Sequence, residues 1–331
     1  MADENERNER NNERKEENIA QIYDKIFKRI LTLSNVAVIN FINGIFNRNF
    51  PKDSKLTYNW TENIKNSLEK TIADTIITVN DTEKFHAEVQ INNDSTIALR
   101  VFDYGYQDAL KYRKTETGRI ILEFPQPKVI FLEHNSSTPD TVILELKFGS
   151  QGNFEYNIPT MKFLDYSIEE LNSRHLVILL PLYLLKLRKE IEKEQSKENA
   201  LKLKALINDG IIKSIEDNER AGNITHEDTV ILVSLLEKLY THLYGGIKKF
   251  KEEGVKDIMA EKLILDIDRV MYERDKVMHE RDKAIQEYEK REEKAKLEIA
   301  KNMLDSGMKI EQVANFTKLP LSKITGLQTN P

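Results

Sequence analysis

The chain has 331 residues, of which 40% are apolar and 32% charged, with a net charge of −5 and no cysteine. This length suits about two domains, and the lack of cysteine excludes disulfides and thiolate metal sites. The acidic balance argues against a surface that coats nucleic acid broadly, but it allows a local basic groove. The N-terminus has no signal-peptide core, and the most apolar run is too short to span a bilayer, so we expect a soluble cytoplasmic protein.

The first half of the chain predicts an α/β core over residues 19–165. Residues 1–18 are charged and low in complexity, which predicts disorder. Helical spacing begins at Ile19, and a second helix should end near Phe46. The remaining elements of this core are then a β-hairpin at 72–79 and 84–91, a helix from about Ala98 to Lys114, and strands at 128–134 and 141–148.

The second half predicts a helical region over 166–254, which opens on a capping box formed by Ser167 and Glu170. The apolar run "HLVILLPLYLL" (175–185) predicts a buried strand and the start of a helix. Helices should fill most of 185–250, with a break at "ERAGNIT" (219–225).

Residues 255–294 form a charged segment in which "YERDKVM", "HERDKAI" and "QEYEKRE" follow one another at a seven-residue period. This pattern predicts a long exposed helix, a coiled coil that would join two chains as a dimer. The tail, 295–327, has helix-turn-helix spacing. Its last helix offers only Ser322, Lys323, Thr325 and Gln328 to DNA, so a helical cap on the coiled coil is the alternative. We expect Val313, Ala314, Leu319 and Ile324 to point inward.

Residues 139–147, "PDTVILELK", spell almost literally the PD-(D/E)xK signature of Mg²⁺-dependent nucleases. Asp140 and Glu145 are five residues apart, and an odd separation on a strand puts two side chains on opposite faces, about 16 Å apart along it. They therefore cannot share a metal ion. The stretch instead predicts an ordinary strand whose polar face carries Glu145 and Lys147.

A second stretch, "ADTIITVNDTEKFHAEVQ" (73–90), matches the PD-(D/E)xK signature less closely but has a better geometry for binding a metal ion. A hairpin centred on Asp81 would pair Val79 with Glu83 and Ile77 with Phe85. The same register sets Asp74 opposite Glu88, with Gln90 two residues further along the same face. Cross-strand Cβ atoms lie about 5 Å apart, close enough for two carboxylates to share one Mg²⁺. The opposite face would be apolar, formed by Ile77, Val79, Phe85, Ala87, Val89 and Ile91.

Several neighbouring residues are weaker candidates, each with an ordinary structural alternative. His86 lies on the carboxylate face and could be a ligand, but a surface histidine is more common, and Gln90 could be an ordinary edge residue. Asp24 and Lys28, one turn apart on the first helix, could reach the site from its flank. On the next helix, Arg100 and Tyr104 could face a phosphate or pack beneath the hairpin.

These stretches together resemble the PD-(D/E)XK nuclease-family transposases, the Rpn-like recombination-promoting nucleases. The resemblance covers most of 20–327 and implies a restriction-endonuclease-like core and Mg²⁺-dependent cleavage of DNA, with Mn²⁺ as a substitute. It places Asp74, Glu88 and Gln90 in the catalytic site, with Asp74 and Glu88 as the metal ligands. The family commonly has Gln where other such nucleases have Lys, which leaves open the group that activates the water. The matching stretches are "YDKIFKRIL" (23–31), "ADTIITV" (73–79), "FHAEVQ" (85–90), "ALRVFDYGYQDALKY" (98–112), "VILLPLYLLKLRK" (177–189) and the tail from Ala295.

Two functions therefore follow from the sequence. The first is a metal-dependent DNA endonuclease in which Mg²⁺ activates water for attack on a phosphodiester and Gln90 orients that water. The alternative is a catalytically degenerate protein that binds DNA or acts as a scaffold through its coiled coil and tail.

Overall fold

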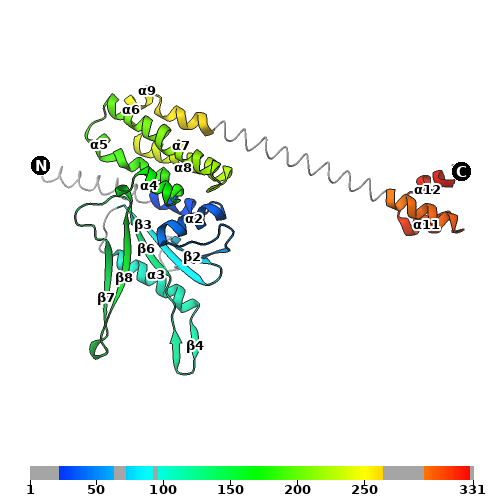
Figure 1. The fold of residues 1–331 in the computed structure, drawn as a ribbon, viewed down its shortest axis with the longest axis horizontal. Coiled ribbons are helices and arrows are strands. Elements are labelled where there is room, and N and C mark those ends of the chain that lie inside the picture. The colour runs from blue at the N-terminus through cyan, green and yellow to red at the C-terminus, as the bar shows by residue number, and fades with distance from the viewer. Residues whose placement is uncertain (1–21, 63–71, 92–95, 264–293, 329–331) are drawn as a thin grey trace, which may run out of the picture. The chain divides into compact units, whose positions relative to one another are not determined.

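The computed structural model describes residues 22–62, 72–91, 96–263 and 294–328, with the backbone alone at 59–62, 72–75 and 326–328. The chain divides into two compact units, Met1–Asp266 and Ile267–Pro331. The first unit contains a six-stranded mixed sheet followed by a helical region (Figure 1). The predicted α/β class is confirmed at this level.

The sheet has the strand order β1-β2-β3-β6-β8-β7 (Figure 1). Strands β1, β2 and β3 are antiparallel neighbours, β3, β6 and β8 run parallel, and β7 returns antiparallel to β8. A separate hairpin, β4 (Lys114–Glu116) and β5 (Arg119–Ile121), lies between β3 and β6 in the sequence. The strands of the main sheet are β1 (Leu56–Glu62), β2 (Ile72–Val79), β3 (Glu83–Gln90), β6 (Gln126–Phe131), β7 (Thr141–Lys147) and β8 (Asn153–Lys162).

The two faces of the sheet bury different cores. One face packs against the helix Ile22–Ile30, against α2 (Asn35–Phe46) and against the later helices. Side chains from β2 and β3 enter this core as the alternation predicted, with Ile77, Val79, Phe85 and Ala87 buried and Val89 and Ile91 partly buried. The opposite face of the sheet packs against α3 (Ile97–Lys111) through a smaller core formed by Ile97, Ala98, Val101, Val129, Phe131 and Ile158.

The helical region continues the larger core rather than building a separate one, since its buried residues contact those of the sheet. The predicted capping box of Ser167 and Glu170 is present, and the predicted break lies between α7 and α8. The elements are α4 (Ile168–Ser173), a 3₁₀ helix η3 (Val177–Leu187), α5 (Arg188–Lys193), α6 (Lys197–Ala205), a π-helix η4 (Leu206–Ile212), α7 (Lys213–Arg220), α8 (His226–Tyr244) and α9 (Lys248–Glu252).

The expectation of a buried strand within 175–185 is wrong, because Val177–Leu187 forms a 3₁₀ helix. Pro181 lies inside it, and proline cannot donate the hydrogen bond that a central strand requires. The segment is apolar on all sides, a pattern that fits any fully buried element. Its side chains from Val177 to Leu185 are all buried.

A single carboxylate joins the starts of two helices. Asp228 accepts a backbone N–H from Ser34 at the start of α2 and one from Thr225 at the start of α8, each at 2.8 Å, and it also bonds the Ser34 hydroxyl. Such caps satisfy N–H groups that a helix leaves without an intrahelical partner. Asp228 therefore fixes α2, which supports the sheet, to α8.

Among the described residues, no single helix is long and apolar enough to cross a membrane. Helices Ile22–Ile30 and Asn35–Phe46 reach that length and composition only as a pair, across a bend of 110°.

The second unit contains a helix over 294–305, α11 (Ile310–Thr317) and α12 (Leu321–Gln328). Its small core buries Val313, Leu319 and Ile324, with Ala314 partly buried, so the predicted inward residues are confirmed. The predicted coiled coil and most of its heptads fall on 264–293, outside the described residues, and the segment 1–18, for which the sequence predicts disorder, lies outside them as well.

Candidate active site

The β2–β3 hairpin has the predicted register. The described pairs run from Val79 with Glu83 to Ile76 with His86, and they include Ile77 with Phe85. Asn80 and Asp81 turn the chain with φ of 52° and 57°, a left-handed conformation that Asn and Asp tolerate better than most residues. Because side chains alternate along a strand and Phe85 and Ala87 enter the larger core, the even-numbered residues of β3 point away from that core and toward α3.

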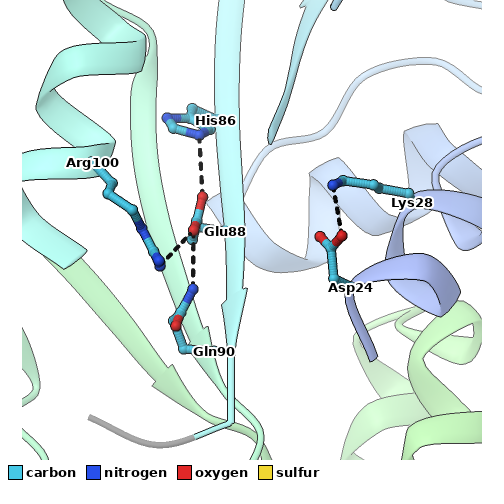
Figure 2. Close-up of polar contacts among 6 residues, drawn as sticks. All are labelled: Asp24, Lys28, His86, Glu88, Gln90 and Arg100. Carbon is cyan, nitrogen blue, oxygen red and sulfur yellow. Dashed lines mark hydrogen bonds and ion pairs between the residues drawn. The ribbon is translucent and has the colours of Figure 1, made fainter. Parts of the chain in front are cut away.

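Glu88 and Gln90 lie on this face of β3, side by side in Figure 2. Glu88 is 3% exposed, and its Oε1 accepts hydrogen bonds at 3.0 Å from Gln90 Nε2 and from Arg100 Nη2. The Arg100 side chain is 38% exposed, so the ion pair extends from a buried carboxylate to the surface. A charge-assisted hydrogen bond of this kind is stronger than a neutral one and holds the carboxylate in a defined orientation.

Helix α3 and strand β3 contact each other in three successive layers. Arg100 pairs with Glu88, the Tyr104 ring meets the His86 ring edge-on with centroids 5.9 Å apart, and Lys84 Nζ bonds Asp108 at 2.6 Å. One helical turn of four residues rises about 6 Å, and two strand residues span about 6.6 Å. The two repeats therefore stay in step, and they bring the helix positions 100, 104 and 108 opposite the strand positions 88, 86 and 84.

His86 is not the surface histidine that we considered more common, because it is 0% exposed. Its Nε2 lies 3.8 Å from Glu88 Oε2 (Figure 2). The Tyr104 ring packs against it from α3, and Arg100 pairs with the neighbouring Glu88, so these two helix residues pack over the hairpin on its polar face. Sequence reasoning missed both members of the third layer, Lys84 and Asp108. The signal that could have found Asp108 is the four-residue repeat that Arg100 and Tyr104 begin.

Asp74 belongs to β2, but its side chain is outside the described part of the structure. Asp74 lies two residues before Ile76 in the chain, and Glu88 lies two residues after His86, which pairs with Ile76. Because the strands are antiparallel, both steps lead away from the turn of the hairpin. The pairing of Asp74 with Glu88 thus stays a prediction from the register.

The side chains that the structure describes here can supply some of the oxygen ligands of a magnesium ion, but not all of them. Glu88 offers carboxylate oxygens and Gln90 an amide oxygen, and Mg²⁺ prefers such hard oxygen ligands. The described residues contain no group of three acidic or histidine side chains able to hold a metal ion. A second carboxylate at this place would have to come from Asp74.

Asp24 and Lys28 do not join this cluster. They form an ion pair with each other at 2.7 Å. Figure 2 shows this pair on the other side of β3 from Glu88. The physical reason is the packing of their helix, whose apolar residues Tyr23, Ile26 and Phe27 enter the larger core on the opposite face of the sheet.

The literal PD-(D/E)xK match forms strand β7 and its lead-in, as predicted. Asp140 is exposed and pairs with Lys162 at 2.8 Å, and this hydrogen bond and charge hold the pKa of Asp140 below its usual value. Glu145 pairs with Lys147 at 3.2 Å on the surface of the strand. The two carboxylates thus have separate partners.

Comparison of the chain with known protein families, with curated proteins and with solved structures finds no match in any of the three.

Proposed function

We propose that the chain is a Mg²⁺-dependent DNA endonuclease of the transposase-associated PD-(D/E)XK type, with a restriction-endonuclease-like core. The observation that carries the proposal is the placement of Glu88 and Gln90 on one face of β3, in contact with each other and with Arg100. An acidic residue and an amide two positions apart, on a strand paired in the predicted register, have the order and spacing that such nucleases use.

Each residue has a definite task in this proposal. Glu88, with Asp74, would hold the metal ion. Mg²⁺, when bound, would supply Lewis-acid polarisation of a phosphodiester and a more acidic water. Gln90 can donate and accept hydrogen bonds, which suits it to orienting a water molecule beside the carboxylate. Arg100 reaches from Glu88 to the surface, where its guanidinium can bind a phosphate oxygen.

One observation favours the alternative, a degenerate nuclease that binds DNA or serves as a scaffold. Glu88 is buried and held by Arg100 and Gln90, an arrangement that also suits a purely structural ion pair. In that case the coiled coil and the tail would carry the function. The two readings differ in whether a divalent cation binds at Glu88 and whether DNA is cut.

The deciding experiment is nicking of supercoiled plasmid by the full chain in Mg²⁺, in Mn²⁺ and in EDTA. We expect metal-dependent nicking by the wild type, and loss of nicking in Glu88→Gln and in Asp74→Ala. Glu145→Gln is the matched control, because Glu145 belongs to the literal motif, is exposed and lies on a different strand. This variant should retain the activity of the wild type.

Nicking by Glu88→Gln at the rate of the wild type would contradict the proposal. A gel shift without nicking by the wild type, in either metal ion, would favour the DNA-binding alternative.

We also propose DNA as the substrate and a second copy of the chain as a partner, joined through 258–294. The heptad pattern supports the dimer, which would suit a double-strand cut. Analytical ultracentrifugation of the full chain tests it, and a monomer at micromolar concentration would contradict it.

A further inference from the structure

A pocket of about 700 Å³ opens on the Glu88 face of the sheet, at the turn end of the β2–β3 hairpin. Its floor includes a row of side chains that are neighbours across three strands, Thr57 on β1, Thr78 on β2 and Lys84 on β3. Tyr112, directly after α3, and Phe124, before β6, contribute aromatic rings to its lining. This volume lies within the range of pockets that bind small organic ligands.

The charged residues that line this pocket are all in ion pairs. Asp81 pairs with Lys55 at 2.8 Å, and Glu83 pairs with Arg48 at 3.1 Å. The other two pairs are Lys84 with Asp108 and Lys114 with Glu123, both at 2.6 Å. The lining therefore presents little uncompensated charge, which disfavours a phosphate or a carboxylate as the occupant.

The remaining lining groups are two aromatic rings, three threonine hydroxyls and the side-chain amide of Gln126. Tyr112 is 47% exposed, and Lys84 Nζ lies 4.1 Å from its ring centroid. Phe124 packs against Phe102 and Tyr156, with centroids 5.3 and 5.8 Å away, so its ring is held in place. The hydroxyls of Thr57 and Thr78 can each donate and accept a hydrogen bond.

Neutralised charges, exposed aromatic surface and hydroxyls suit a flat, uncharged heterocycle that stacks and forms hydrogen bonds at its edge. We propose that this pocket binds an unstacked nucleobase of a nucleic-acid strand, with Tyr112 as its stacking platform. Lys84 and Glu88 lie four residues apart on the same face of β3, which corresponds to about 13 Å along the strand. Roughly four stacked nucleotides span that distance.

The inference rests on the proposed function only for the identity of the ligand as nucleic acid, and its test needs no cleavage. The probe is a short single-stranded DNA carrying 2-aminopurine, titrated with the full chain in EDTA. Fluorescence of 2-aminopurine falls when the base stacks on an aromatic ring. We expect saturable quenching by the wild type and by Tyr112→Phe. In Tyr112→Ala we expect loss of the quench and about tenfold weaker binding.

Two further variants make the result specific. Thr57→Met places a longer side chain without an aromatic ring over the pocket floor, from an exposed position on the edge strand β1, and should also abolish the quench. Tyr106→Ala removes an exposed tyrosine of α3 that is not among the lining residues, and it should leave the quench unchanged. Circular dichroism melting of each variant checks that the fold is retained.

Unchanged quenching in folded Tyr112→Ala, or no quenching by the wild type, would overturn the inference. Displacement of the oligonucleotide by free adenosine at an equal base concentration would also overturn it, because the ligand would then be a nucleoside rather than a strand. Quenching by a chain that cuts no plasmid in Mg²⁺ would support the pocket while the nuclease proposal fails. Nicking without quenching would have the opposite meaning.

Discussion

Replacing Arg100 by alanine should destabilise the protein more than replacing its partner, Glu88, by glutamine. The ion pair is asymmetric, because the Glu88 side chain is 4% exposed while that of Arg100 is 38% exposed. Arg100→Ala leaves a buried carboxylate without the guanidinium charge, and burying a charge without such compensation is costly. Glu88→Gln removes the buried charge and keeps an oxygen acceptor for Gln90, while the guanidinium can turn to water.

The size of the difference follows from the exposure of the pair. A hydrogen bond to a charged group contributes about 1.5–3 kcal/mol, and screening by solvent at the exposed Arg100 places this one near the lower end. We therefore expect Arg100→Ala to lower the free energy of unfolding by ~1.5 kcal/mol and Tm by about 3–6 °C. Glu88→Gln should change the free energy of unfolding by less than about 0.5–1 kcal/mol.

Thermal unfolding followed by circular dichroism, in EDTA and in Mg²⁺, measures both effects. A ligand that binds only the native state raises Tm, so Mg²⁺ should raise the Tm of the wild type and of Arg100→Ala but not that of Glu88→Gln. A larger loss of stability in Glu88→Gln than in Arg100→Ala, measured in EDTA, would refute the reasoning about the buried charge. A rise in Tm with Mg²⁺ in Glu88→Gln equal to that of the wild type would remove Glu88 from the metal site.

Three other changes test the packing around the sheet. Asp228→Ala removes the hydrogen bonds that the N-cap residues of two helices, Ser34 and Thr225, donate to this carboxylate, and it should cost about 2 kcal/mol in urea unfolding, whereas the exposed neighbour variant Glu227→Ala should cost much less. Gly44→Ala would place a Cβ 2.2 Å from a carbonyl oxygen and should cost about 1–3 kcal/mol or more. Gly246→Ala, with open space around its Cβ, is the control for that change. Burial raises the pKa of Tyr240 to about 12, above its ordinary value of 10.0. Because the folded protein therefore holds this proton more tightly than the unfolded chain does, the contribution of Tyr240 to the free energy of unfolding is complete below pH 10 and is lost as the pH rises through 12. Tyr240→Phe should flatten that loss in unfolding measured across this pH range.

The alternation of apolar residues was sufficient to predict the hairpin, its register and the face it buries. This worked because a one-residue slip would turn Phe85 and Ala87 away from the larger apolar core and point Glu88 into it, so the pattern admits one register. Strands β1 and β8 were not predicted. β1 is an edge strand with a mixed sequence, and β8 contains Pro159, which ordinarily argues against a strand.

The sequence by itself determined which side chains share a face, because that follows from the two-residue period of a strand and the near four-residue period of a helix. It therefore placed Glu88 with Gln90, and Arg100 with Tyr104, before any coordinates. Only the tertiary structure decided that these two faces meet, that His86 is buried between them, and that Asp24 lies on the other side of β3. Such contacts depend on which face of the sheet each helix covers, and that choice is set by packing of the whole chain rather than by local periodicity.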